Sequence, residues 1–426
     1  MQIIENKLIK EKVYIEKLNS GFTIMCIPKG NTRKKYAICG VGYGSNDNRF
    51  IKANESKETI IPDGVAHYLE HKMFEQESGV NSLDTLSSLG VEANAYTTND
   101  HTAYLFECTN NFEKAIDELL SYVQNPYFTD QNVEKEKDII AQEIKMYEDE
   151  PEWKVYINCM KALYSKNPIR IDVAGSVESI QKITKETLYE CYNNFYIPEN
   201  MVLILVGNFE PEKAIEEMKT KITMENRIKA KTIEEKEENK INQKEIIENM
   251  DISVPIFAIG YKINPEEKEK VKRNLAIEIL LEILFGESSE FYKTIYEKGL
   301  VYEPLTTSFE WSRNYAHILI QGKSENVDEI EKTLKERIQK TIDNGIEEKA
   351  FERAKRKIYG LYVKEFNNVD QEAILFTSNY FKKINPFEYI ENYKIISKEY
   401  LEKVLKEAFK EENSVKSSIN PQKNNQ

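Results

Sequence analysis

The sequence repeats one pattern of apolar strand, polar loop and helix, and this repeat limits the folds open to the chain. The strand-like run KYAICGVGYGS at 35–45 is followed by a polar loop and by the helical segment GVAHYLEHKMFE at 64–75. The run VPIFAIGYKIN at 254–264 is followed in the same way by NLAIEILLEILFG at 274–286. We therefore predict an α+β fold of two similar domains from an internal duplication, each a mostly antiparallel sheet packed with helices.

A charged segment separates the two copies. Residues 226–250 are rich in charge and almost without aromatic side chains, and apolar strand-like runs flank them. A chain of 426 residues is too long for one ordinary core. We predict an N-terminal domain at 1–225, a linker at 226–250, a C-terminal domain at 251–412 and a disordered tail at 413–426, whose polar residues have little to bury.

Charge and composition exclude several classes of protein. With 72 acidic against 59 basic residues, the formal net charge is −13. This disfavours nucleic acid and anionic membranes as partners, since both need a basic face. No apolar run of about 18 residues occurs, so no membrane span is expected, and the amino terminus has no signal-peptide core. Five scattered cysteines without a C-x-x-C pair indicate small buried side chains in a reducing compartment, and we expect a cytoplasmic protein.

The segment HYLEH at 67–71 holds two of the four histidines of the chain. On an α-helix, positions i, i+3 and i+4 share one face, so His67, Glu70 and His71 project together. Two imidazoles one turn apart can bind one zinc ion, and the glutamate between them can take a proton from a zinc-activated water. H-x-x-E-H is the inverted form of the H-E-x-x-H zinc helix. The alternative is that both histidines are ordinary core or surface residues.

A catalytic zinc site needs a third protein ligand, and the segment 132–151 supplies candidates. Its apolar residues fit a helix with one buried side. Glu136 and Glu143 lie two turns apart on one face of such a helix. Glu143 is embedded in the apolar stretch IIAQEI, where a carboxylate without a cation or a hydrogen-bond donor would be costly. A solvated helix of charges is the alternative, and it explains Glu148 better than Glu143.

These two segments together resemble the pitrilysin, insulinase and mitochondrial processing peptidase family of zinc endopeptidases. The resemblance extends to LGVEANAYTTNDHTAYLFEC at 89–108, which is similar to the family's substrate-binding edge strand. It also extends to 174–209, which is similar to the segment that closes the family's first domain. Phrases such as HKMFE are similar to bacterial members associated with 5-aminopentanol modification of elongation factor P.

The resemblance implies roles for the residues of both helices. His67, His71 and Glu143 would bind one zinc ion per chain. Glu70 would be the general base of a zinc endopeptidase, and Glu136 would orient a ligand histidine. The fold implied is a clam-like half of a peptidase chamber.

The resemblance also implies how a substrate would be held. A peptide or small protein would lie extended against the edge strand, at Asn94, Ala95 and Tyr96, where backbone pairing gives affinity. Active family members further carry an arginine and a tyrosine, in a phrase like L-R-E-K-x-G-L-x-Y, that hold the substrate and the developing oxyanion. Here the phrase is TIYEKGLVYEP, in which Tyr302 is present and Tyr296 stands where the arginine is expected.

This departure from the family leaves two hypotheses. In the first, a homologous subunit without the zinc motif supplies the arginine and tyrosine in a heterodimer, as in several bacterial relatives, or the chain forms a weakly active homodimer. In the second, the chain is a non-catalytic peptide-binding or scaffold subunit. An intact H-x-x-E-H segment favours the first hypothesis, because a scaffold has no need of it.

Overall fold

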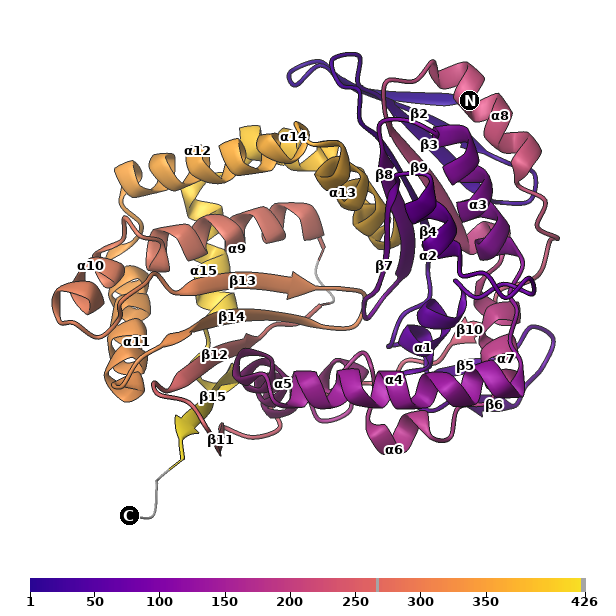
Figure 1. Cartoon of the computed structure of the whole chain (residues 1–426). Coiled ribbons are helices and arrows are strands. Elements are labelled where there is room, and N and C mark those ends of the chain that lie inside the picture. Colours follow the sequence, from indigo (N-terminus) through magenta and orange to yellow (C-terminus); the bar gives the residue numbers. More distant parts are fainter. Residues whose placement is uncertain (266–267, 423–426) are drawn as a thin grey trace. The chain divides into compact units, whose positions relative to one another are not determined.

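The computed structural model describes residues 1–265 and 268–422, and the chain divides into two compact units (Figure 1). Unit 1 comprises Met1–Ile144, Asp172–Glu234 and Val363–Pro386, and unit 2 comprises Lys145–Ile171, Glu235–Tyr362 and Phe387–Gln426. Both units are discontinuous in sequence, which differs from the continuous domains expected at 1–225 and 251–412. The reason is tertiary: a late helix covers a sheet formed by the first part of the chain.

The main sheet of unit 1 has seven strands. Its order is β1 (Gln2–Asn6), β2 (Glu11–Lys17), β3 (Thr23–Pro28), β9 (Met201–Gly207), β4 (Lys35–Val41), β8 (Thr102–Cys108) and β7 (Glu92–Thr97). Neighbours are antiparallel except for β3 and β9, which are parallel. The central strands β9 and β4 are almost wholly buried, as their continuous apolar sequences require. Strand β7 is an edge of the sheet.

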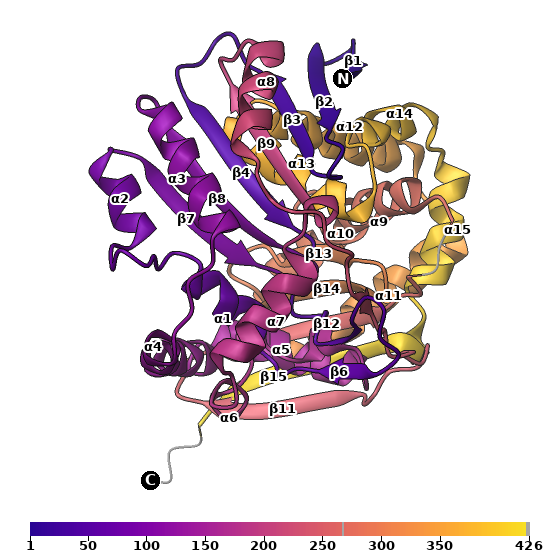
Figure 2. The same cartoon turned by 90° about the vertical axis from the view of Figure 1, so that its right-hand side faces the viewer.

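Helices cover both faces of this sheet, as Figures 1 and 2 show. The helices of unit 1 are α1 (Val65–Lys72), α2 (Ser82–Ser88), α3 (Phe112–Gln124), most of α4 (Asp130–Glu148), α6 (Val177–Ile180), α7 (Lys185–Phe195), α8 (Pro211–Lys221) and α13 (Val369–Lys382). Helices α3 and α8 lie on one face, and α13 lies on the other. Helix α13 is attached by the Tyr380 hydroxyl, 2.9 Å from Thr23 Oγ1, and by Glu372, 2.7 Å from Lys29 Nζ. A small sheet of β10 (Lys231–Thr232), β5 (Arg49–Ile51) and β6 (Glu58–Ile60) completes the unit.

Unit 2 contains a five-stranded sheet. Its order is β11 (Glu245–Met250), β15 (Ser414–Pro421), β12 (Ile256–Lys262), β14 (Ala316–Lys323) and β13 (Thr306–Trp311). The helices of unit 2 are α5 (Pro151–Leu163), α9 (Lys270–Phe285), α10 (Glu290–Glu297), α11 (Val327–Asn344), most of α12 (Glu348–Glu365), α14 (Phe387–Ile395) and α15 (Lys398–Ala408). Short 3₁₀ turns lie at Pro168–Arg170 and Glu411–Asn413 in unit 2 and at Pro198–Asn200 in unit 1. Helix α5 packs on β12 and β15 through a core that includes Cys159 and Ala258.

The topology confirms two similar α+β halves. In unit 1 the last five strands of the sheet run β3, β9, β4, β8, β7, and in unit 2 the five run β11, β15, β12, β14, β13. In each list the first pair is parallel and the others are antiparallel. The second strand in each order, β9 or β15, comes last of the five in the sequence. The third strand, β4 or β12, is followed later in the chain by the helix α1 or α9. A shared order of this kind is what an internal duplication produces.

Two segments differ from the sequence prediction. Of the expected tail at 413–426, residues 414–421 form β15, which lies between β11 and β12 and pairs with both. Backbone hydrogen bonds to two neighbours hold this polar strand in place, and residues 423–426 lie outside the described part. Within the expected linker at 226–250 the chain passes from unit 1 to unit 2 after Glu234, but β10 and β11 already belong to sheets.

Two further observations concern the side chains and helices of the described residues. All five cysteines are buried and free, as expected for small apolar-like side chains. Among the described residues, none of the helices has the length and apolar character that crossing a membrane requires.

Candidate metal centre

Helix α1 begins at a glycine that no other residue could replace without strain. Gly64, at its N-terminus, has φ of 91°, in the left-handed region. A Cβ atom on Gly64 would lie 2.3 Å from the carbonyl oxygen of Ala174. The loop that holds Ala174 and Gly175 therefore packs directly against the start of α1 and fixes where the following histidines lie.

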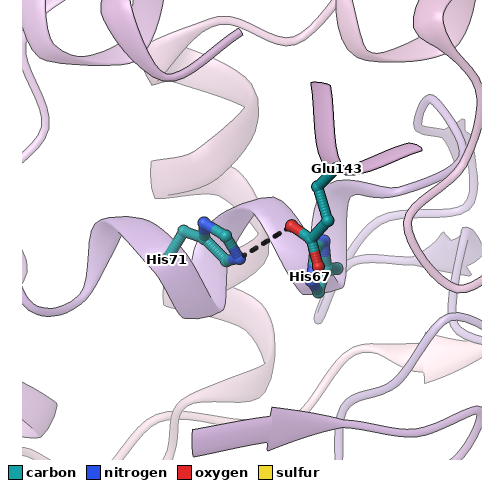
Figure 3. Close-up of side chains that lie close together, drawn as sticks. All are labelled: His67, His71 and Glu143. Carbon is teal, nitrogen blue, oxygen red and sulfur yellow. Dashed lines mark ion pairs between the residues drawn. The ribbon is translucent and has the colours of Figure 1, made fainter. Parts of the chain in front are cut away.

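Helix α4 lies against α1 and brings the third side chain. The Tyr68 hydroxyl donates a hydrogen bond to the carbonyl oxygen of Val133, which joins the two helices on their buried sides. His67 and His71, which flank Tyr68 on α1, meet Glu143, ten residues after Val133 on α4 (Figure 3). Ligand atoms of these three side chains all lie within 4.8 Å of one another. Within the described part of the chain, these three are the His, Cys, Asp or Glu side chains that lie close enough together to hold one metal ion.

The donor atoms converge on one place. His67 Nε2 lies 3.6 Å from Glu143 Oε1, and His71 Nε2 lies 3.5 Å from Glu143 Oε2. The three side chains are only partly exposed, at 13%, 25% and 23%. Two imidazole nitrogens and one carboxylate oxygen make the donor set of a catalytic zinc site, in which a fourth position stays open.

Burial and neighbouring charges set the protonation of these side chains. Burial lowers the pKa of His67 to about 3, and the nearby His71 adds to the decrease, so His67 is neutral and its nitrogen can bind a metal. Burial also lowers the pKa of His71, but the hydrogen bond to Glu136 and the charges of Glu70 and Glu136 outweigh it and raise the pKa. Burial raises the pKa of Glu143. The cluster thus combines a histidine that resists a positive charge with carboxylates that attract one.

Glu136 contacts His71 on the side away from Glu143. Glu136 Oε1 lies 3.1 Å from His71 Nδ1, so a proton on Nδ1 leaves Nε2 free to face the centre. Burial would raise the pKa of Glu136, but hydrogen bonds to His71 and Lys72 lower it overall. The structure therefore places Glu136 beside His71, the histidine that the family resemblance predicts it to orient.

Glu70 lies beside the centre and is tied to the edge strand. Its Oε2 accepts a hydrogen bond of 2.7 Å from the hydroxyl of Thr97, the last residue of β7. Burial raises the pKa of Glu70, and the charges of His71 and Glu143 act on it in opposite directions. A buried carboxyl with a raised pKa next to a metal centre is suited to accept and return a proton.

The predicted substrate-binding residues lie in two places. Asn94, Ala95 and Tyr96 lie on β7, whose backbone pairs with β8 on one side only. Asn94 is exposed, and its side-chain oxygen accepts from the backbone N–H of Ala95 at 2.8 Å. Tyr302 belongs to unit 2, where its side chain is 80% exposed.

Two residues of this centre escaped the sequence prediction. Lys72 is wholly buried and binds Glu136, and Thr97 binds Glu70. A signal for Lys72 existed, because Tyr68, Leu69 and Lys72 share a helix face by their spacing, and a lysine on an apolar face needs a partner. Thr97 carried no comparable signal.

The corresponding place in unit 2 shows what the centre requires. Ile279 and Ile283 of α9 stand where α1 has its two histidines, and both are buried. Glu282 stands where α1 has Glu70, and it pairs with Lys357 Nζ at 2.8 Å. The second half therefore keeps the helix and has two buried isoleucines in place of the two histidines.

Both halves of the chain are similar to known sequence families. The sequence model described as Insulinase (Peptidase family M16) matches residues 51–176, and that described as Peptidase M16 inactive domain matches 182–358. A Bacillus subtilis protein named uncharacterized zinc protease YmfH is 37% identical over 412 residues, which cover 95% of each chain.

Solved structures have a similar fold over nearly the whole chain. The crystal structure of an M16-like peptidase from Alicyclobacillus acidocaldarius has a TM-score of 0.92 at 31% identity, and the match covers 98% of this chain and 99% of that one. A protease from Helicobacter pylori has a TM-score of 0.85 at 19% identity, with 96% and 100% covered, and this likeness concerns the fold alone. The two family matches and the relative that spans nearly the whole chain show that this protein belongs to peptidase family M16, the insulinase family.

Proposed function

We propose that this chain is a zinc-dependent endopeptidase that hydrolyses peptides held in extended form against β7. One observation carries the proposal: His67, His71 and Glu143 converge, and the neighbouring Glu70 is bonded to the last residue of that edge strand. The names of relatives such as the zinc protease YmfH support the same activity.

Each side chain has a separate task in this proposal. His67, His71 and Glu143 would hold one zinc ion, and Glu136 would keep His71 in the tautomer that leaves Nε2 unprotonated. Zinc, when bound, supplies a Lewis acid that polarises a peptide carbonyl and acidifies a water. Glu70 accepts the proton of the attacking water and returns it to the leaving amine, which its raised pKa favours.

The edge of the sheet would position the substrate. An edge strand presents unpaired backbone N–H and C=O groups, and an extended peptide can add to it as a further strand. The bound peptide would lie beside Asn94, Ala95 and Tyr96 of β7. Because Thr97 ends β7 and binds Glu70, a peptide paired along β7 runs toward the proposed base.

A partner subunit would complete the site. Tyr296, at the place of the expected arginine, is exposed on α10 and cannot donate as a guanidinium does. A missing oxyanion donor typically lowers kcat by about 100-fold or more. We propose that a homologous subunit without the zinc motif supplies the arginine and tyrosine in a heterodimer, with a weakly active homodimer as the other form. Buried free cysteines fit a reducing compartment, and we place the enzyme in the cytoplasm.

A non-catalytic subunit that binds peptides is the second candidate, and Tyr296 is the observation that favours it. Peptide cleavage by the wild-type chain separates the two, and Glu70→Gln tests whether Glu70 is the base. We expect the wild-type chain to contain about one zinc ion and to cleave unstructured peptides, weakly alone and faster with such a homologue. Glu70→Gln should keep the zinc and lose the cleavage. A wild-type chain that binds zinc and peptide but cleaves nothing, alone or with the homologue, would establish the second candidate.

A further inference from the structure

We propose that Lys72 is a positioning residue of the metal centre: its buried ammonium group holds the carboxylate of Glu136 in the orientation in which Glu136 fixes His71. The inference rests on the metal site of the proposed function and does not depend on peptidase activity. It concerns a residue that directly follows His71 in the sequence and is not one of the three side chains that could hold a metal ion.

Lys72 is completely buried, which is unusual for a lysine. Its side chain has 0% exposure. Lysine is almost never fully buried unless it is paired, because removing the ammonium from water is costly. Two carboxylates meet this need: Glu136 Oε2 lies 3.1 Å from Lys72 Nζ, and Glu75 Oε1, one turn along the chain, also binds it.

Glu136 uses both of its oxygens in this arrangement. Oε2 faces Lys72, and Oε1 faces His71 Nδ1 at 3.1 Å. A carboxylate with partners on both oxygens cannot rotate without breaking one of the contacts. The contacts therefore run in a line from Lys72 through Glu136 to His71, whose other nitrogen points toward Glu143.

Charge explains why a lysine serves here. The charges of Glu70, Glu136 and Glu143 all act on His71, and Lys72 is the cation bonded to Glu136. Without Lys72 the buried Glu136 would lose a partner and would turn toward water, because a buried carboxylate is costly without a cation or hydrogen-bond donors. His71 would then lose the contact that orients its ring.

The expected size of the effect follows from similar partners in other metal sites. Removing a group that orients a ligand typically weakens metal affinity by about 10- to 100-fold. We expect this loss for Lys72→Met, which keeps the length of the side chain and removes the charge. Zinc affinity is measured by competition with a chelator, and thermal unfolding of the metal-free protein monitors the fold.

A double-mutant cycle with Glu136→Gln separates positioning from simple support of the helix. If Lys72 acts through Glu136, Lys72→Met costs no further zinc affinity in a chain that already carries Glu136→Gln. Lys137→Met is the matched control. Lys137 is also nearly buried, but it binds Glu134 Oε2 at 2.7 Å and the Gln181 carbonyl oxygen at 3.1 Å, and zinc affinity should not change.

The outcomes are distinct. Wild-type zinc affinity in Lys72→Met, or an equal loss in the Glu136→Gln background, would overturn the proposal. If Lys72→Met does not fold, the same cycle with Lys72→Gln decides, since the amide keeps polar contacts and lacks the charge. A wild-type chain that binds zinc but cleaves no peptide, alone or with the homologue, refutes the peptidase and leaves the cycle valid. A chain that binds no zinc overturns both.

Discussion

Thr97 and Glu70 join the edge strand to the metal helix through one hydrogen bond of 2.7 Å. The Thr97 hydroxyl also lies 3.3 Å from Thr102 Oγ1, and Thr102 in turn donates to the carbonyl oxygen of Tyr43 at 2.9 Å. Because a carbonyl only accepts, the proton of Thr102 is used there, and Thr97 keeps its own proton for Glu70. The strand that would hold a peptide and the base that would act on it are therefore fixed relative to each other.

Removing this hydroxyl should slow catalysis without removing the metal. Thr97→Val keeps the shape of the side chain and the strand, but it leaves one oxygen of Glu70 without its donor. A hydrogen bond to a charged group is worth about 1.5–3 kcal/mol, so we expect kcat to fall about 10- to 100-fold. The zinc content and the KM for peptides should change little.

Thr97→Ser is the matched variant, because it restores the hydroxyl and omits only the methyl group. Its kcat should return close to the wild-type value. Steady-state kinetics with a fluorogenic peptide provide the measurement. A kcat of Thr97→Val equal to that of the wild type would show that the bond has no part in catalysis.

Glu143 should be needed for metal binding. Glu143→Gln keeps the size of the side chain and replaces a charged oxygen donor with a neutral one. We expect zinc affinity to fall by more than the 10- to 100-fold typical of residues that only orient ligands. Zinc should then no longer raise the unfolding temperature, since stabilisation by a ligand depends on its affinity. Glu148→Gln, at the exposed end of the same helix, is the control and should bind zinc as the wild type does.

The sequence allowed some parts of this centre to be predicted and left others out of reach. The helical period alone places His67, Glu70 and His71 on one side of a helix. Glu143 required knowledge of which helix lies next to α1, and this came from the resemblance to a family. The helical spacing puts Lys72 on the apolar face of Tyr68 and Leu69, but it does not reveal that Glu136 is its partner. The bond from Thr97 to Glu70 depends on how a strand and a helix pack.

Domain limits were harder to predict for a related reason. Helix α13 belongs to unit 1 although it lies late in the chain, and no local pattern reveals which sheet a helix will cover. Strand β15 has a polar sequence that suggested a disordered tail. Its pairing with β11 and β12 stabilises it through the backbone, which composition does not reveal.

Gly64 should be essential for the position of α1. In Gly64→Ala a methyl group would meet the Ala174 carbonyl oxygen at 2.3 Å, in addition to the strain of a left-handed backbone. Such strain alone costs about 1–3 kcal/mol, so we expect a larger loss in the free energy of unfolding and weaker zinc binding. Gly79→Ala is the matched control: Gly79 also has a positive φ, of 78°, but nothing lies within 4 Å of its Cβ position. Equal losses in the two variants, measured by urea unfolding, would contradict the role of the contact.

Glu237, in the segment predicted as a linker, should make unit 2 sensitive to acid. Its carboxylate accepts from the backbone N–H groups of Ser165, Lys166 and Asn167 at 3.0, 2.8 and 2.7 Å, and from Lys262 Nζ at 2.7 Å. Burial raises the pKa of Glu237, but these donors outweigh it and lower the pKa from its ordinary value of 4.5 to about 2. The charged form is thus favoured in the folded state.

The sign of the pH effect follows from the direction of this shift. Because the folded pKa lies below the unfolded one, the stabilisation is complete above pH 4.5 and is lost as the pH falls toward 2. Glu237→Gln should therefore lower the free energy of unfolding by about 3 kcal/mol at pH 7. The difference from the wild type should shrink as the pH falls below 4.5, as urea unfolding with a chelator present would measure. Glu238→Gln, at an exposed neighbour, should leave stability unchanged, and a Glu237→Gln effect that stays constant between pH 7 and 3 would exclude the titration of this carboxylate as its cause.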